Sequence, residues 1–255
     1  MKKKLTIFAL ILVLVASFCV VLTACGEEQE VFYDHFSFVY DSGAGGLVLS
    51  VNKEKTLPAD LTVPSEYYAD SDSGRTQKRA VVAIADDAFK NLSAVVSIVV
   101  PSSVKKIGNN AFSGCTGLTS IELTGVETLG KSAFRNCTGL TSVTLSDKLA
   151  EVSDGAFYGC SNLLTVASGK IKTIGAEAFS GCIALMSLDT DYSQLRTIGA
   201  RAFFFTGCFS EIDITSCTSV GAYAFQGWAQ SQTVKYSSTT GWDANWNADA
   251  SFKKA

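Results

Sequence analysis

The sequence predicts an α/β solenoid in which a parallel sheet forms one face and short turns or single helical turns form the opposite face. Three observations predict this class. An Ala-Phe pair recurs every 22 to 24 residues, apolar residues hold fixed positions around each pair, and one segment of each unit alternates between apolar and polar residues. A repeat of this length is typical of a structure in which each unit buries its apolar side chains against the next. We therefore expect seven stacked coils in one domain, spanning residues 81–236.

The Ala-Phe pairs set the period of the repeat. With each phenylalanine as position 0, position −1 is always alanine, and positions −5 and +9 are isoleucine, leucine or valine in every unit. Position +6 is apolar in every unit except the last, where Ser231 stands. We expect these positions to face inward, because residues of this kind are the ones most often buried. The seven phenylalanines are Phe89, Phe112, Phe134, Phe157, Phe179, Phe203 and Phe225.

The segment from position +8 to +12 predicts one short strand in each coil. In Ser120–Thr124, apolar and polar residues alternate with the period of two that is typical of a strand with one buried face. The apolar pattern at position +11 weakens at Ser168 and Thr190. One strand in each coil gives a parallel sheet along the solenoid.

The segment from position −4 to +3 predicts the opposite wall. Residues 108–115 are too few, and too rich in glycine and asparagine, for a stable free helix, so we expect a turn with about one helical turn. Glycine at position −4 is expected to supply a tight corner with positive φ. It stands there in five units, as Gly108, Gly130, Gly175, Gly199 and Gly221.

The pattern I-G-x-x-A-F-x-G-C-x-x-L-x-x-I-x-L resembles the BspA-like type of bacterial leucine-rich repeat. The resemblance extends from about Leu61 to Trp246 and weakens in the sixth and seventh units, where Phe203–Phe205 and Trp228 replace the usual small residues. Proteins of this family are described as surface antigens and adhesins. The resemblance therefore implies a binding module that is displayed at the cell surface.

The first residues predict a secreted lipoprotein. Lys2–Lys4 precede an apolar stretch, and the small residues before Cys25 resemble a lipoprotein signal spanning residues 1–24. Acyl chains on Cys25 then hold the protein on the membrane of the cell envelope, with residues 25–30 as a tether. The alternative is an uncleaved membrane anchor, and both place the remaining chain outside the cytoplasm.

The charge of the chain argues against nucleic acid as a partner. Loss of residues 1–24 removes three lysines and changes the formal net charge from −3 to −6. Nucleic-acid binding needs clustered lysine and arginine, which this chain lacks.

Both ends of the solenoid are expected to carry covers, because a terminal coil exposes apolar surface. Residues 31–80 are predicted to form an N-terminal cap and first coil, with a hairpin over Phe36–Tyr40 and Leu47–Val51. Residues 237–255 are predicted to form the C-terminal cap. Within it, Trp242 and Trp246 either cover the last coil or stack on a sugar.

Four cysteines share position +3, and three interpretations compete for them. Zinc needs ligands that converge on one point, whereas equivalent positions in successive coils form a line. Disulfides need side chains that turn toward each other. We expect a buried ladder of free thiols and no metal or cofactor. Cys115, Cys137, Cys160 and Cys182 form this set, and no pairing is predicted for Cys208 and Cys217.

Catalysis has few candidate residues. The chain contains one histidine, His35, and the Ser102–Lys105 segment, which has the spacing of a Ser-Lys pair, lies at a repeat corner. We therefore predict no enzyme, since no nucleophile is paired with a base.

The exposed positions +8 and +10 of the strands are the predicted ligand-binding face. Their residues are small, polar and slightly acidic, and a merely soluble surface is the alternative interpretation. Three functions stay open: a protein-binding adhesin, a carbohydrate or cell-wall binder using Trp242 and Trp246, and an envelope scaffold anchored through Cys25. The predicted ligand-binding residues are Glu122, Thr144, Asp189, Glu211 and Asp213.

Overall fold

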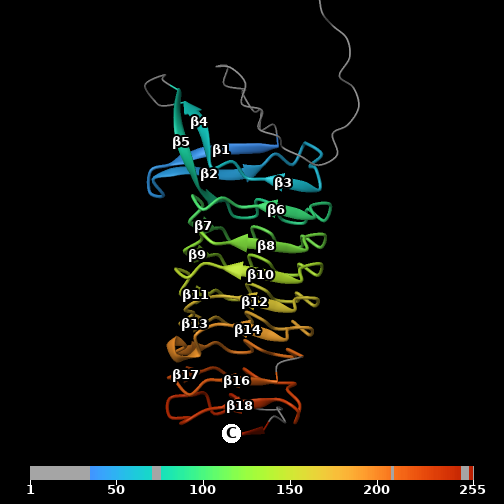
Figure 1. The fold of residues 1–255 in the computed structure, drawn as a ribbon, viewed down its shortest axis with the longest axis vertical. Coiled ribbons are helices and arrows are strands. Elements are labelled where there is room, and N and C mark those ends of the chain that lie inside the picture. Colours follow the sequence, from blue (N-terminus) through green and yellow to red (C-terminus); the bar gives the residue numbers. More distant parts are fainter. Residues whose placement is uncertain (1–34, 71–75, 208–209, 248–252, 255) are drawn as a thin grey trace, which may run out of the picture. The chain divides into compact units, whose positions relative to one another are not determined.

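Parallel strands stacked one per coil form the first wall of the solenoid, the strand wall, in a computed structural model that describes residues 35–70, 76–207, 210–247 and 253–254 (Figure 1). In each of the seven repeats the strand begins at position +8, as the alternation predicts. A six-stranded sheet is followed by a three-stranded one. The first contains β3 (Asp60–Thr62), β6 (Ser97–Val99), β8 (Ser120–Leu123), β10 (Ser142–Leu145), β12 (Thr165–Ala167) and β14 (Ser187–Asp189). The second contains β16 (Glu211–Asp213), β18 (Thr233–Lys235) and β19 (Lys253–Lys254).

A second set of parallel strands, divided between two sheets, runs along the solenoid and was not predicted. Most of its strands are two residues long and end at position −5, whose side chain is buried in every coil. Two residues are too few for an alternating pattern to be visible in the sequence. Its members are β5 (Thr76–Ile84), β7 (Lys106–Ile107), β9 (Thr128–Leu129), β11 (Glu151–Val152), β13 (Thr173–Ile174), β15 (Thr197–Ile198) and β17 (Ser219–Val220).

The third wall, which we call the turn wall, consists of the segments equivalent to residues 108–115, and here the predicted helical turn is wrong. Positions −2 and +2 have positive φ in every coil, as at Asn110 (51°) and Gly114 (75°), and this conformation interrupts a right-handed helix. The backbone N–H of Phe112 donates to the carbonyl oxygen of Ala133 in the next coil, at 2.8 Å. Hydrogen bonds between coils therefore replace the bonds within a helix. Among the described residues, the only helix is the short 3₁₀ segment Tyr192–Gln194.

The glycines at position −4 do not have positive φ, so their predicted role is also wrong. Each lies against the backbone of the preceding coil. A Cβ atom at Gly130 would lie 2.4 Å from the carbonyl carbon of Gly108, and one at Gly199 would lie 2.4 Å from the nitrogen of Ala176. These glycines are needed because two backbones approach closely, and not because the chain turns there.

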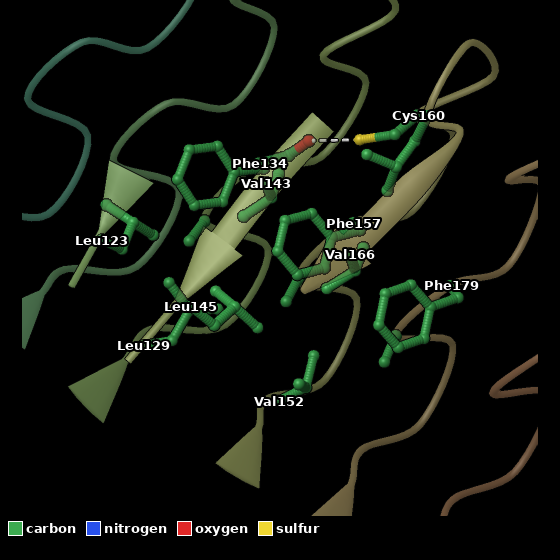
Figure 2. Close-up of a cluster of buried hydrophobic side chains, with 14 of the residues drawn as sticks. Leu123, Leu129, Phe134, Val143, Leu145, Val152, Phe157, Cys160, Val166 and Phe179 are labelled. Carbon is green, nitrogen blue, oxygen red and sulfur yellow. Dashed lines mark hydrogen bonds between the residues drawn. The ribbon is translucent and has the colours of Figure 1, made fainter. Parts of the chain in front are cut away.

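The core is one continuous column of side chains enclosed by the three walls, and the predicted stacking is confirmed. The rings of the seven phenylalanines are fully buried, and consecutive centroids lie 4.9 to 5.6 Å apart with interplanar angles of 3° to 12°. Figure 2 shows Phe134, Phe157 and Phe179 in this column, with Val143 and Val166 of the strand wall beside them. Complete burial of such a side chain contributes about 1.5–3 kcal/mol, so each coil is stabilised mainly by its neighbours.

Aromatic side chains cover both ends of the phenylalanine column. The predicted hairpin is present as β1 (Phe36–Asp41) and β2 (Gly46–Val51), and the ring of Phe36 contacts Phe89 edge-on at 6.3 Å. A second hairpin joins β4 (Glu66–Asp70) to β5. At the other end, Trp246 contacts Phe225 edge-on at 6.0 Å.

Candidate binding surfaces

Three of the five predicted ligand-binding residues form one row on the strand wall. Parallel pairing places Glu122 opposite Thr144, Thr144 opposite Ala167, and Ala167 opposite Asp189. The side chains of Glu122, Thr144 and Asp189 are exposed. Neither carboxylate makes an ion pair with another described residue. The row is therefore a fixed set of polar groups open to solvent.

The other two predicted residues lie in the second sheet of the strand wall, and their carboxylates are engaged. Glu211 forms an ion pair with Lys235 of the neighbouring strand. Asp213 is half-buried and accepts hydrogen bonds from the backbone N–H and the hydroxyl of Thr215, at 3.0 and 2.7 Å. These two acids differ from Glu122 and Asp189 because part of their hydrogen-bonding capacity is already used.

The two tryptophans proposed for sugar stacking pack against each other and the last coil. Trp246 is buried, and Trp242 meets its ring edge-on at 4.9 Å. Tyr236 contacts Trp246 at 5.3 Å, and the indole N–H of Trp242 donates to the carbonyl oxygen of Cys217. Trp246 is thus closed to a ligand and Trp242 is half-buried against the core, which favours the covering role.

The four cysteines at position +3 are buried and free, as expected, and each also donates a hydrogen bond. Each Sγ donates to the carbonyl oxygen of the phenylalanine in the preceding coil, at 3.0 to 3.1 Å. Figure 2 shows this bond from Cys160 to Phe134. Thr206 and Trp228, which hold position +3 in the last two coils, donate to the equivalent carbonyl oxygens at 3.0 Å. In six of the seven coils, position +3 therefore carries a hydrogen-bond donor; the first coil has Leu92 there.

The remaining candidates for chemistry are dispersed. Burial raises the pKa of the free thiol of Cys217 to about 12, while Cys208 lies outside the described residues. The ammonium group of Lys105 donates to the backbone carbonyl oxygen of Ser102 at 2.7 Å. Among the described residues, no group of three or more histidine, cysteine or acidic side chains is arranged to hold a metal ion.

A groove of about 440 Å³ crosses the turn wall, and the sequence analysis missed it. Its lining includes alanine at position −3 in the last three coils, as Ala176, Ala200 and Ala222. Earlier coils carry longer side chains at that position, such as Lys131 and Asp154. This change from polar residues to alanine was the available signal, since a missing side chain on an outer wall leaves a hollow.

The lining of the groove, which we call the turn-wall groove, carries charges of both signs. Lys131 and Asp154 form an ion pair at 2.9 Å, and the hydrogen bond from Lys131 holds the pKa of Asp154 below its usual value. Arg201 and Glu177 lie 3.9 Å apart. The guanidinium of Arg135 stacks over Tyr158 at 3.9 Å and makes no ion pair with a described residue.

The residue at position −3 also determines whether the backbone N–H of position −3 in the next coil has a hydrogen-bond acceptor. The Oδ1 atoms of Asp86, Asn109 and Asp154 accept from the N–H groups of Asn109, Lys131 and Ala176, at 2.7 to 2.9 Å. Alanine offers no such oxygen. Consequently, the N–H groups of Ala200 and Ala222, beside the groove, have no acceptor among the described residues.

The predicted lipidation site, Cys25, lies outside the described residues, as do the signal segment and the tether. Within the described part of the chain, no helix has the length and apolar character needed to cross a bilayer.

Comparisons with known proteins agree with this architecture. A leucine-rich cell surface protein from Faecalibacterium prausnitzii is 23% identical with a TM-score of 0.68, over 83% of this chain and 55% of that protein. A leucine-rich repeat protein from Eubacterium ventriosum is 25% identical with a TM-score of 0.59, over 74% of this chain and 49% of that protein. The chain thus spans about half the length of these two proteins. No curated protein matches its sequence.

The repeat itself identifies the family. The family model described as the BspA type leucine-rich repeat region matches in six copies, over residues 82–170 and 166–242. These ranges cover more than half of the 255 residues and contain all seven phenylalanines of the column. The chain belongs to the family of BspA-type leucine-rich repeat proteins.

Proposed function

We propose that this protein is a lipid-anchored binding module of the bacterial cell envelope, displayed outside the cytoplasm, that binds another protein and catalyses no reaction. The row of Glu122, Thr144 and Asp189 on the strand wall supports this proposal most directly. Hydrogen bonds between β8, β10, β12 and β14 hold these side chains at fixed spacing. A rigid surface loses little entropy on binding, so repeat proteins bind ligands through such faces.

The partner's chemistry follows from the charge of this row. Glu122 and Asp189 carry two carboxylates, and the row contains no cation. Charge complementarity therefore selects a protein with a basic patch, and it raises the association rate most at low ionic strength. A sugar platform at Trp242 and Trp246 is less well supported, because Trp246 is buried.

The strand-wall proposal is tested with a double variant, Glu122→Gln with Asp189→Asn. The variant and the wild type are compared for binding to immobilised extracellular-matrix and envelope proteins at two salt concentrations. We expect weaker binding and a smaller salt dependence, because both changes remove charge without changing side-chain size. Glu151→Gln is the matched control, since this exposed acid lies in β11 on a different wall. Equal affinity of the double variant and the wild type would contradict the proposal.

Anchoring through Cys25 is tested separately in cells. An alkyne-tagged fatty acid should label the wild-type protein and should not label Cys25→Ser. Cys19→Ser is the control, because this cysteine lies within the predicted signal segment and should not affect labelling. If Cys25→Ser is labelled as strongly as the wild type, the anchoring proposal is wrong, and the strand-wall test is unaffected.

A further inference from the structure

We propose that the turn-wall groove binds an acidic saccharide. Carboxylate groups of the sugar chain would accept hydrogen bonds from the free backbone N–H groups of Ala200 and Ala222. This site is separate from the strand wall, because the groove is lined by residues of positions −3, −2 and +1. It therefore adds a second class of ligand to the proposed protein partner.

The chain shows what fits beside these N–H groups. In the fourth coil, the carboxylate of Asp154 accepts the N–H of Ala176 at 2.9 Å, and in the first coil Asp86 accepts the N–H of Asn109 at 2.7 Å. The alanines at 176 and 200 leave the equivalent places without a side-chain oxygen. A ligand carboxylate can occupy these places and accept the same bonds, which are stronger when the acceptor is charged.

The cations of the groove favour the same group. Arg135 lies in the lining and makes no ion pair with a described residue, and its guanidinium carbon lies 3.9 Å from the centre of the Tyr158 ring. A planar guanidinium offers paired N–H donors that match a carboxylate. Lys131, Arg135 and Arg201 outnumber Asp154 and Glu177 in the lining. The groove therefore has a small positive balance on a chain whose net charge is −3.

The remaining lining favours a sugar over an acidic peptide. A saccharide carries hydroxyl groups beside its carboxylates, and these hydroxyls can donate to Asp154 and Glu177 in addition to the partners that the two acids already have. The aromatic ring of Tyr223, at one end of the lining, offers an apolar surface for a sugar ring. A peptide is usually held by pairing with an open strand edge. On the turn wall, the N–H groups of Phe157, Phe179 and Phe203 are already used between coils.

The experiment uses trigalacturonate as the probe and follows the amide resonances of the protein by NMR. The amide signals of Ala200 and Ala222 should shift on titration, and methyl-esterified trigalacturonate should have no effect. Arg135→Gln should weaken binding by about tenfold or more, because a charged hydrogen-bonded contact is lost. Ala176→Asn should abolish the response of Ala200, because the new side chain would occupy the place of the ligand as Asn109 does in the second coil.

The controls separate this proposal from the others. Ala176→Asn introduces a residue that the repeat already accepts at position −3, so the variant should fold, and it adds no charge. Glu122→Gln on the strand wall should bind trigalacturonate like the wild type. The proposal is wrong if trigalacturonate shifts neither amide, if the methyl ester binds equally well, or if Ala176→Asn binds like the wild type. It is also wrong if a hexa-aspartate peptide shifts the same amides with equal or higher affinity, since the occupant would then be an acidic peptide.

Discussion

The Sγ atom of Cys160 lies 3.0 Å from the carbonyl oxygen of Phe134, in the preceding coil, and donates a hydrogen bond to it. The same contact recurs along the solenoid, and in the sixth coil the hydroxyl of Thr206 donates in place of a thiol. The buried cysteines therefore form hydrogen bonds between coils and also pack in the core.

Replacement of Cys160 by threonine or valine tests this bond. The two residues have nearly the same shape, and only threonine can donate to the Phe134 carbonyl. We expect Cys160→Val to be less stable than Cys160→Thr by about 1 kcal/mol, the usual net contribution of one hydrogen bond. Urea unfolding followed by circular dichroism measures the difference. Equal stability of the two variants would show that the donor contributes nothing.

Two glycine substitutions test two different reasons for glycine: close approach to a neighbouring backbone at Gly130, and positive φ at Gly181. Gly130→Ala should destabilise the protein by about 1–3 kcal/mol, because its Cβ atom would lie 2.4 Å from the backbone of Gly108. Gly181→Asn should cost less than about 1 kcal/mol, since asparagine tolerates the left-handed region and Asn136 occupies the equivalent position with φ of 57°. Thermal unfolding of both variants measures which substitution destabilises the protein more. A Gly130→Ala variant that is more stable than Gly181→Asn would contradict the prediction.

Removal of one buried hydroxyl should stabilise the solenoid. Thr190 holds position +11, where four other coils carry valine, leucine or isoleucine, and its buried Oγ1 has no hydrogen-bond partner among the described residues. Thr190→Val keeps the shape and removes this oxygen, so we expect a gain of about 1 kcal/mol in the free energy of unfolding. Thr144→Val, at an exposed position of the strand wall, is the control and should change stability little. The prediction is wrong if Thr190→Val lowers the unfolding midpoint.

The ion pair of Lys131 and Asp154 should be visible in an acid titration. The hydrogen bond from Lys131 lowers the pKa of Asp154 below the usual value of an aspartate. The resulting stabilisation is present above the unfolded-state pKa and is lost as the pH falls through the lowered folded-state pKa. In an NMR titration of the Asp154 carboxyl, Lys131→Met should move the midpoint upward. An unchanged midpoint would mean that the pair does not form in solution.

The sequence predicts the inward-facing parts of this fold well and its outer walls poorly. The phenylalanine column, the strand at position +8 and the buried free thiols follow from apolar patterning, which recurs seven times. The helical turn and the role assigned to Gly130 are wrong, because composition does not distinguish a residue with positive φ from one pressed against a neighbouring backbone. That distinction depends on the spacing between coils.

The candidate sites show the same division. The exposure of Glu122 and Asp189 follows from alternation along one strand, whereas the engagement of Glu211 by Lys235 depends on a contact between two coils. The turn-wall groove depends on comparing position −3 across coils, from Lys131 to Ala200. A pattern read along one repeat does not contain that comparison.

The regular contacts between neighbouring coils also bear on how such a protein changes during evolution. Each phenylalanine ring, each donor at position +3 and each glycine at position −4 meets only the coil beside it. A gene duplication that copies one complete period would therefore supply its own partners on both sides. The lineage can lengthen or shorten both outer surfaces, and so alter what they recognise, without redesigning the interior.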